Sequence, residues 1–369
     1  MTRRSRSLTS LLAVASIASL ARAQAPRESV LSFRTVQVAE GVYAFITPEE
    51  RSGFQAGNSV AIIGDSSVLV FDTGNLPSAT RAEIAQLRKL TSKPVRFVVN
   101  SHWHPDHNLG NAEYRAAFPG VTIIGTQATH DGIRDFVPRY IIEMQGFHQQ
   151  DSLMKLRLST GRMRDGTPMP DNVRTMWSIV TQDYDVFMPE VNSAKPTPSN
   201  LVFTDSLTID LGNREVRIVS PGRGNTAGDA FIWVPGSKTL LTGDLVTLPA
   251  PFPGTSFFAD WIRDLDVLHR YGAQAIVPGH GDVQHDYAYV DMVHDLLVFT
   301  LEGARAAVRR GETAEQAEKG IDFSEWEKRF GGGDLVRTDA FGSFYSKQVV
   351  PRAWEQAKAE SERALPPGA

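Results

Sequence analysis

A short run of histidines limits the possible folds and functions of this chain more than any other part of its sequence. Residues 95–99 form a nearly all-apolar run typical of a buried strand, and His102, His104, Asp106 and His107 follow directly after it. Imidazole nitrogens and carboxylate oxygens are the ligands that suit zinc and similar divalent ions. His102 and His104 can converge on one ion, while Asp106 and His107 can reach a second. The run therefore predicts a metal site at the carboxyl end of this strand.

Alternating strands and helices surround the histidine run. Residues 35–45 are patterned as an opening hairpin, and residues 58–63 and 68–72 as a pair of strands. Apolar residues at helical spacing predict a helix over 78–90, and residues 121–124 read as another strand. A second group of strands is predicted over 201–203, 207–210, 215–219, 230–234 and 239–242. This alternation predicts a layered α/β domain.

Three segments depart from the alternation. Residues 131–200 carry helical pieces, a polar middle with glycine and proline, and most of the methionines. Because methionine adapts to irregular apolar shapes, this insertion either lines a substrate pocket or forms a small core of its own. Residues 249–258 are predicted as an aromatic lip of the cleft or as a packed loop. Residues 301–369 are predicted as a helical C-terminal extension, which leaves 33–300 as the main domain.

The histidine run has counterparts elsewhere in the chain. His102-x-His104-x-Asp106-His107 resembles the signature of the metallo-β-lactamase superfamily. Three further stretches resemble other landmarks of that family in the expected order: Asp72-Thr73-Gly74, Thr242-Gly243-Asp244 and Gly279-His280-Gly281. The resemblance covers residues 36–285. It implies an α/β fold of the αββα sandwich type with a metal site at one edge, to which the predicted helical insertion and helical C-terminal tail are added.

The resemblance also implies how the ligands divide between two zinc ions. The first ion would be held by His102, His104 and Asp244. The second would be held by Asp106, His107, Asp244 and His280, so that Asp244 is shared. Asp72 would support the site from behind by holding a ligand or the backbone in place, and Thr226 is expected in the same supporting layer.

The chain departs from the family pattern at Asn225, where a histidine is usual. An amide oxygen is a weaker zinc ligand than an imidazole, so the first zinc site is expected to be weakened. Three interpretations stay open: Asn225 is a weak ligand in a two-zinc centre, the protein works with one tightly held ion, or catalysis is lost. His130, which follows a predicted strand, could replace the missing imidazole. The remaining histidines lack partners at ligand spacing and are not expected to bind metal: His148, His269, His285 and His294.

The implied ligands predict a hydrolase that attacks a carbonyl substrate. Zinc lowers the pKa of a bound water to about 7, which makes a metal-bound hydroxide available at neutral pH. Asp106 or a metal-bound water is the candidate proton donor to the leaving group, and Asp244 is the second candidate catalytic residue. The substrate would be a β-lactam, a lactone, an ester or a thioester. The alternative is an exported metal-binding protein whose catalysis is lost or altered because of Asn225.

The amino terminus predicts export. Three arginines among the first six residues precede an apolar run over 8–20, and small residues alternate up to Ala23. These are the parts of a secretory signal peptide. We expect cleavage near Ala23, so that residues 1–23 are removed and the protein is periplasmic or secreted. An uncleaved membrane anchor is the alternative.

Composition narrows the class of partner. The chain has 369 residues, of which 41% are hydrophobic and 22% charged, as in soluble globular proteins. A net charge of −4 gives no electrostatic reason to expect a nucleic acid. No later stretch approaches the roughly 20 apolar residues that span a bilayer. We therefore expect a small-molecule substrate and no membrane contact in the mature form, with the oligomeric state unknown.

Overall fold

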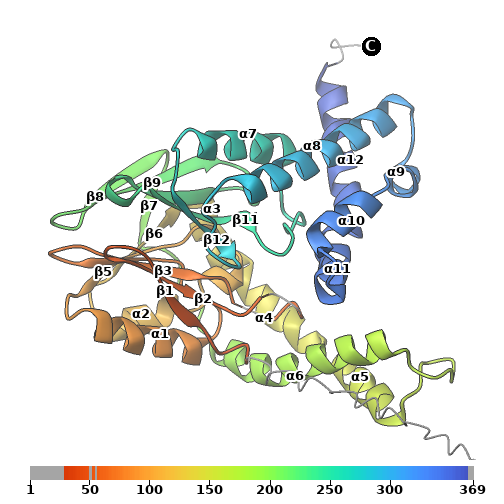
Figure 1. The fold of residues 1–369 in the computed structure, drawn as a ribbon, viewed down its shortest axis with the longest axis horizontal. Helices are drawn as coiled ribbons and strands as arrows, with labels where there is room; N and C mark the ends of the chain where they lie inside the picture. Colours follow the sequence, from red (N-terminus) through yellow and green to blue (C-terminus); the bar gives the residue numbers. More distant parts are fainter. Residues whose placement is uncertain (1–28, 50–51, 55, 365–369) are drawn as a thin grey trace, which may run out of the picture.

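The chain folds into two β-sheets packed face to face, with helices on both outer faces (Figure 1). The computed structural model describes residues 29–49, 52–54 and 56–364. The predicted signal peptide, residues 1–23, lies outside these ranges. In the described part of the chain, no helix is long and apolar enough to cross a membrane.

The first sheet has seven strands in chain order. These strands are β1 (Arg34–Ala39), β2 (Val42–Ile46), β3 (Ser59–Ile63), β4 (Val68–Phe71), β5 (Val95–Val99), β6 (Thr122–Thr126) and β7 (Leu201–Phe203). The strands from β1 to β4 pair antiparallel, and those from β4 to β7 pair parallel. The predicted hairpin and strand pair at the start of the chain are therefore confirmed.

The second sheet has five strands in the order β12-β11-β10-β9-β8. Their bounds are β8 (Ser206–Asp210), β9 (Glu215–Gly222), β10 (Asp229–Val234), β11 (Thr239–Thr247) and β12 (Ala275–His280). The β11–β12 pair is parallel and the others are antiparallel. Strand β10 is buried on both faces, because Phe231 and Trp233 point to the helices while Ile232 and Val234 point to the first sheet.

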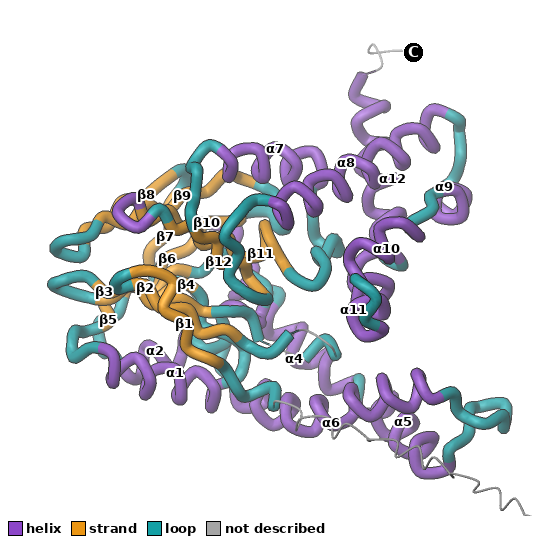
Figure 2. The backbone as a smooth tube through the Cα atoms, viewed as in Figure 1, coloured by secondary structure: helices purple, strands orange, loops and turns teal. Residues whose placement is uncertain are grey.

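Helices cover the outer face of each sheet, and Figure 2 shows the strands enclosed between them. On the first sheet lie α1 (Pro77–Leu90) and α2 (Asn111–Ala117), and on the second lie α7 (Phe258–His269) and α8 (Ala288–Arg309). Apolar clusters fill all three interfaces: one between the sheets and one under each helical layer. The αββα sandwich predicted from the sequence is confirmed.

A helical insertion lies between β6 and β7. It contains α3 (Gln127–Asp135), α4 (Val137–Gly146), α5 (His148–Thr160) and α6 (Asp171–Ser193). The prediction missed α6, a helix of 23 residues, because Pro170 and Pro189 suggested an irregular segment. Pro170 precedes the helix, and Pro189 is accommodated inside it. Tyr184, Phe187, Met188 and Val191 follow helical spacing and pack in one apolar cluster with residues of α1.

A helical tail follows α8. It contains α9 (Ala314–Gly320), α10 (Ser324–Gly331), α11 (Leu335–Phe341), a π-helical turn (Gly342–Ser346) and α12 (Val349–Ala364). Its buried residues Phe341, Tyr345 and Val350 belong to the same apolar cluster as Trp261 of α7. The tail is therefore packed on the second sheet's helical layer. The predicted boundary at residue 300 lies inside α8, and the division into domains stays a prediction.

A carboxyl group is buried between α1 and the first sheet. Glu83 is 4% exposed, and Ser59 Oγ of β3 donates a hydrogen bond of 2.5 Å to its Oε2. Burial raises the pKa of Glu83 from 4.5 to about 8, although the hydrogen bond from Ser59 opposes this shift. Glu83 is therefore mainly protonated in the folded protein at neutral pH.

The Glu83→Gln variant tests this protonation. The unfolded chain releases the Glu83 proton above pH ~4.5 but the folded protein keeps it up to pH ~8, so this residue's contribution to stability is lost as pH rises between them. Glutamine keeps the acceptor for Ser59 and does not titrate. We expect the midpoint of thermal unfolding of Glu83→Gln to fall less than that of the native protein between about pH 5 and about pH 8. Equal falls in circular dichroism melts of the two proteins would contradict the assignment.

Candidate metal centre

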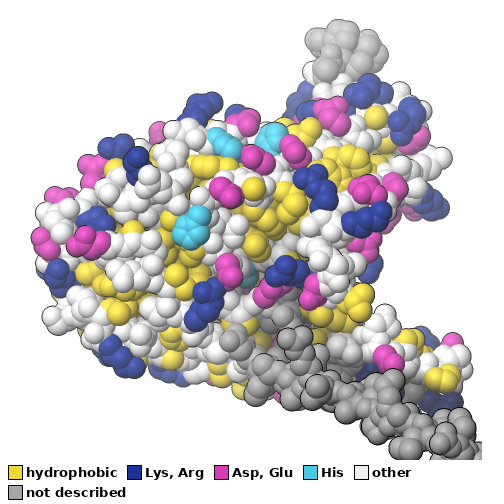
Figure 3. All heavy atoms as spheres, in the orientation of Figure 1, with side chains coloured by type: hydrophobic (Ala, Val, Ile, Leu, Met, Phe, Trp, Pro, Cys, Tyr) yellow, Lys and Arg dark blue, Asp and Glu magenta, His cyan; other side chains and the backbone are white. Residues whose placement is uncertain are grey.

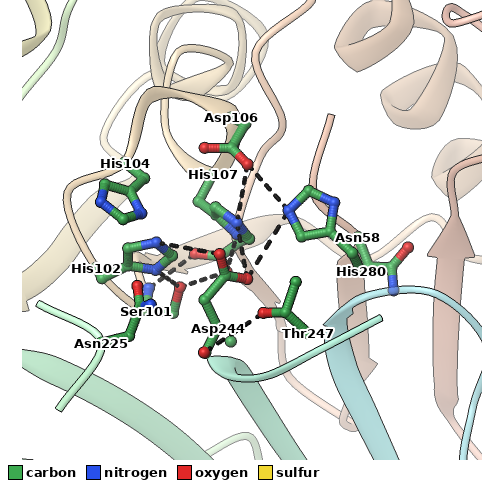
Figure 4. A network of polar contacts seen from close by, with 12 residues as sticks. Asn58, Ser101, His102, His104, Asp106, His107, Asn225, Asp244, Thr247 and His280 are labelled. Atoms are coloured by element: carbon green, nitrogen blue, oxygen red, sulfur yellow. Dashed lines mark hydrogen bonds and ion pairs between the residues drawn. The ribbon is translucent and has the colours of Figure 1, made fainter. Parts of the chain in front are cut away.

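Strand ends from both sheets meet at one edge of the sandwich. Asp72 follows β4 and the histidine run follows β5, and because β4 and β5 are parallel, their carboxyl ends lie together. Asp244 lies in β11 and His280 ends β12, which is the second parallel pair. Figure 4 shows the resulting group of side chains facing one another.

Two groups of side chains at this edge could hold a metal ion. The trio consists of His102, His104 and Asp244, and the quartet consists of Asp106, His107, Asp244 and His280. Within each group, one ligand atom per residue lies within 4.8 Å of all the others. These are the groups predicted from the sequence, and both use Asp244.

The distances inside the quartet are short. His107 Nε2 lies 3.2 Å from Asp244 Oδ1 and 3.3 Å from Asp106 Oδ2. His280 Nε2 lies 3.0 Å from Asp106 Oδ2 and 3.8 Å from Asp244 Oδ1. In the trio, His102 Nε2 lies 3.6 Å from Asp244 Oδ2.

Asp72 supports the centre from behind. It is 1% exposed, and its φ of 59° is a left-handed conformation that few non-glycine residues adopt. This turn brings its carboxylate under the histidine run. Asp72 Oδ1 accepts a hydrogen bond from Ser101 N at 2.7 Å, and Oδ2 accepts from Ser101 Oγ at 2.7 Å and from His107 Nδ1 at 3.0 Å.

These contacts determine which ring nitrogen of His107 and of His102 carries the lone pair. When His107 is neutral, as in a metal ligand, its Nδ1 donates to Asp72 and its lone pair is on Nε2. The Ser101 hydroxyl also donates to Asp72, and it therefore accepts from His102 Nδ1 at 2.8 Å. In both imidazoles the lone pair is on Nε2, which faces Asp244. Such hydrogen bonds to the rear nitrogen are typical of metal-binding histidines.

In His104 the two ring nitrogens have the opposite roles. Its Nε2 lies 2.9 Å from Thr255 Oγ1, and that hydroxyl donates to the backbone oxygen of Asn225 at 3.0 Å. Since the hydroxyl proton goes to Asn225, Thr255 accepts from His104 Nε2, and the lone pair of His104 is on Nδ1. No motif in the sequence points to this role of Thr255, which is separated from His104 by 151 residues.

Asn225 lies beside His102 (Figure 4). Its Nδ2 donates to the backbone oxygen of Phe252 at 2.8 Å, while its buried Oδ1 has no hydrogen-bond partner. The amide is thus oriented with an unused oxygen, which is the atom a weak metal ligand would offer. Thr226, the next residue, donates through its backbone nitrogen and hydroxyl to Asp229, which holds the loop that carries Asn225.

The backbone packs closely against two of the ligands. A Cβ at Gly279 would collide with Asp244 Oδ1, and a Cβ at Gly57 would overlap the ring of His107. Glycine is therefore required at both positions because the backbone passes directly against a ligand side chain.

Asn58 links the first sheet to the loop that carries His280. Its Nδ2 donates to the backbone oxygens of Pro278 at 3.0 Å and Gly281 at 2.8 Å, on either side of His280. Its Oδ1 accepts from the backbone nitrogen of Thr47 at 3.1 Å. The sequence pattern predicts a strand at Asn58 and gives no sign of this role in the site.

The charges of the centre suit a cation. Burial and the neighbouring imidazoles hold the pKa of His102 well below its ordinary value, and burial lowers the pKa of His104, so both are neutral. Burial disfavours the charged form of His107, but the carboxylates of Asp244, Asp106 and Asp72 outweigh it and raise the pKa of His107 well above its ordinary value. A divalent cation can take the place of the proton that these carboxylates hold on His107.

A pocket opens over the centre. Its volume is about 380 Å³, and its floor includes His104, Asp106, Asp244 and His280. Of the loop after β11, Phe252 and Thr255 line the pocket, as expected for a lip. Among the described residues of the insertion, Tyr140 lines the pocket and no methionine does. Of the two interpretations, the one in which the methionines line the pocket is wrong: Met144 and Met188 instead pack in an apolar cluster that the insertion shares with residues of the first sheet's helical layer.

The other histidines lie outside both groups. His130 Nδ1 lies 2.9 Å from the backbone oxygen of Ser199, and the ring belongs to neither the trio nor the quartet. His130 therefore does not replace the imidazole that is absent at position 225. His269 is paired with Asp291, and His294 lies near acidic residues of its own surface.

Comparison with known proteins places this centre in a family. Residues 52–280 match the metallo-beta-lactamase superfamily. The chain therefore belongs to the metallo-beta-lactamase superfamily, whose members are metal-dependent hydrolases.

Individual relatives are distant. A linear primary-alkylsulfatase from Pseudomonas sp. (strain ATCC 19151) is 22% identical over 227 residues, which cover 58% of this chain and 39% of the relative. A metallo-beta-lactamase type 2 from Elizabethkingia meningoseptica is 22% identical over 205 residues, covering 53% of this chain and 79% of the relative. A solved metallo-beta-lactamase from Pontibacter korlensis has 18% identity and a TM-score of 0.49, over 72% of this chain and 99% of that one.

The Thr255→Val variant tests the orientation of His104. Valine keeps the shape of the side chain but removes the hydroxyl that accepts from His104 Nε2. We expect the zinc affinity of the trio to fall by roughly tenfold, as is usual when a hydrogen bond behind a metal ligand is removed. Thr255→Ser keeps the hydroxyl and is expected to bind like the native protein. Zinc titration against a chromophoric chelator measures this, and native affinity in Thr255→Val would refute the role of Thr255.

The Asn225→His variant tests the weakened site. We expect it to bind zinc at the trio more tightly than the native protein does, because an imidazole replaces an amide oxygen. Metal content after dialysis against a graded zinc buffer gives the measurement. Unchanged zinc content would mean that residue 225 does not face the ion.

Proposed function

We propose that this chain is an exported, zinc-dependent hydrolase that attacks a carbonyl compound. The observation that carries the proposal is a set of buried atoms without hydrogen-bond partners: His102 Nε2, His107 Nε2, Asp244 Oδ1 and Asn225 Oδ1. Leaving buried polar atoms unpaired costs roughly 1–3 kcal/mol each. Several such atoms at one edge of the sandwich are explained most simply by bound cations.

In this proposal two zinc ions share Asp244. The trio holds the first ion, with Asn225 Oδ1 as a weak fourth ligand, and the quartet holds the second. Imidazole and carboxylate donors favour zinc over calcium or magnesium, which prefer oxygen ligands alone. Occupancy of the quartet alone is the variant of this proposal in which Asn225 leaves the first site too weak to fill.

The chain's own residues then serve the reaction as follows. When bound, zinc supplies Lewis acidity, which makes water more acidic and polarises a carbonyl. Asp106, with its side chain 24% exposed at the pocket floor, can hold a proton and return it to the leaving group. Asp72 and Thr255 keep the histidine lone pairs directed inward. Trp103 and Phe252 keep bulk water away from one side of the centre.

The substrate in this proposal is a small molecule: a β-lactam, a lactone, an ester or a thioester. Acidic and basic side chains are interspersed on the face drawn in Figure 3, which favours no polyanionic partner there. We further propose that residues 1–23 are a signal peptide, so that the protein acts in the periplasm or outside the cell. Residues 33–300 would form the hydrolase domain and residues 301–369 its extension.

The experiment that tests this proposal also distinguishes it from two other functions. Asn225 favours a metal-binding protein without turnover, because it replaces a strong ligand with a weak one. The alkylsulfatase among the relatives makes an alkyl sulfate a second candidate substrate, and the apolar pocket over the centre would suit its alkyl chain.

Turnover in the presence and absence of a chelator tests the proposal. We expect the zinc-loaded protein to hydrolyse at least one of four chromogenic substrates: a cephalosporin, a lactone, an ester or a thioester. Dipicolinate is expected to abolish this activity, and added zinc to restore it. Asp244→Ala is expected to lose roughly a hundredfold or more in kcat/KM, because both ions lose a ligand.

The controls separate the alternatives. His148→Ala, which removes an exposed histidine outside the centre, is expected to behave like the native protein. Zinc binding without turnover of any carbonyl substrate would sink the hydrolase proposal. Release of sulfate from an alkyl sulfate, with no carbonyl hydrolysis, would move the assignment to sulfate esters.

A further inference from the structure

Aromatic side chains from separate segments wall the pocket over the centre. Trp103 comes from the histidine run, Phe252 from the loop after β11, Tyr140 from the insertion and Phe344 from the C-terminal tail. The pocket volume of about 380 Å³ falls in the range of small-molecule sites, which is roughly 300–1,000 Å³. Leu248, an apolar residue of the loop that carries Phe252, also lines the pocket.

Contacts with neighbouring residues fix the positions of the Trp103 and Phe252 side chains. The ring of Trp103 packs 5.3 Å from that of Phe136, and a Cβ at Gly132 would collide with it, so α3 presses directly on the indole. The ring of Phe252 lies 5.8 Å from that of His104, and its backbone oxygen accepts from Asn225 Nδ2. An apolar group bound between them would lie next to the reacting centre.

The other two walls come from the helical additions to the sandwich. Tyr140 lies in α4, and Phe344 lies in the π-helical turn before α12, where a Cβ added at Gly53 would come into ordinary contact with its ring. In Figure 1 the insertion and the tail flank the same end of the sandwich. The two segments therefore contribute one aromatic ring each to a pocket whose polar floor belongs to the sandwich.

The charges of the pocket are unfavourable for an anionic substituent. Among the described residues that line it there is no lysine or arginine, and the cations that we propose lie in its floor rather than along its aromatic side. A carboxylate buried along the aromatic walls would lose hydration without gaining a cationic partner. An uncharged apolar group would instead gain from the loss of apolar surface to water.

We propose that the pocket selects esters with an uncharged apolar acyl chain, and that Tyr140 and Phe344 determine this specificity. This inference rests on the proposed carbonyl-hydrolase function and narrows its substrate. In the reaction, the oxygen of water bonds to the acyl carbon and the acyl carbon–oxygen bond breaks. The leaving alkoxide takes a proton, so the products are a carboxylic acid and an alcohol.

A series of nitrophenyl esters tests the selection. We expect kcat/KM to rise roughly threefold to fourfold per added methylene from acetyl to octanoyl, because each buried methylene favours binding by that factor. An octanoyl ester with a terminal carboxylate is expected to be a poorer substrate than its uncharged counterpart. Equal kcat/KM along the series would overturn the inference.

Two variants locate the effect. Tyr140→Ala and Phe344→Ala are each expected to reduce kcat/KM for the octanoyl ester by roughly tenfold or more, and to leave the acetyl ester nearly unchanged. Ile142→Ala on α4 and Phe299→Ala on α8 are matched controls, since both side chains are exposed and neither lines the pocket. Native chain-length dependence in both pocket variants would contradict the assignment of these residues.

A binding measurement separates this inference from the proposed function. Calorimetry with uncleavable methyl ketones is expected to show tighter binding of methyl octyl ketone than of methyl ethyl ketone, and loss of this preference in Phe344→Ala. If the preference is found but no ester is hydrolysed, the pocket assignment stands and the hydrolase proposal fails. If esters are hydrolysed but neither kcat/KM nor ketone binding depends on chain length, the pocket assignment fails alone.

Discussion

The buried carboxylate of Asp72 is the contact on which the metal centre depends. It accepts three hydrogen bonds from Ser101 and His107, and through Ser101 it also orients His102. A left-handed backbone at Asp72 makes these bonds available at the end of β4. This conformation costs of order 1–3 kcal/mol, which the surrounding packing must offset. The Asp72 carboxylate thus fixes the orientation of the His102 and His107 side chains at the end of the strand.

The second half of the centre depends on how the two sheets pack. Asp244 and His280 belong to the second sheet, so their distance from the histidine run is set by the apolar cluster between the sheets. Asn58 reinforces this arrangement by bonding to the backbone on both sides of His280. A one-residue slip of β12 in its pairing with β11 would turn His280 to the other face of the sheet and separate it from the other ligands.

The metal ligands could be predicted from the sequence mainly because four of them lie within six residues of one another. The histidine run is local, and the two further ligands follow strand patterns in an order that limits where they can lie. Thr255 could not be predicted, because its contact with His104 exists only after the loop beyond β11 folds back. The helix α6 was missed because its prolines obscured a regular apolar stripe, and Glu83 was placed in a helix without any sign that this face is buried.

The chemistry and the choice of substrate come from different parts of the chain. Strand ends of the sandwich carry every residue of the trio and the quartet, whereas the insertion and the tail each place one aromatic ring in the wall above them. A side chain in that wall can change in size without altering the hydrogen bonds that hold the histidines. Substrate preference can therefore vary while the reaction stays the same, because the interactions that control each are physically separate.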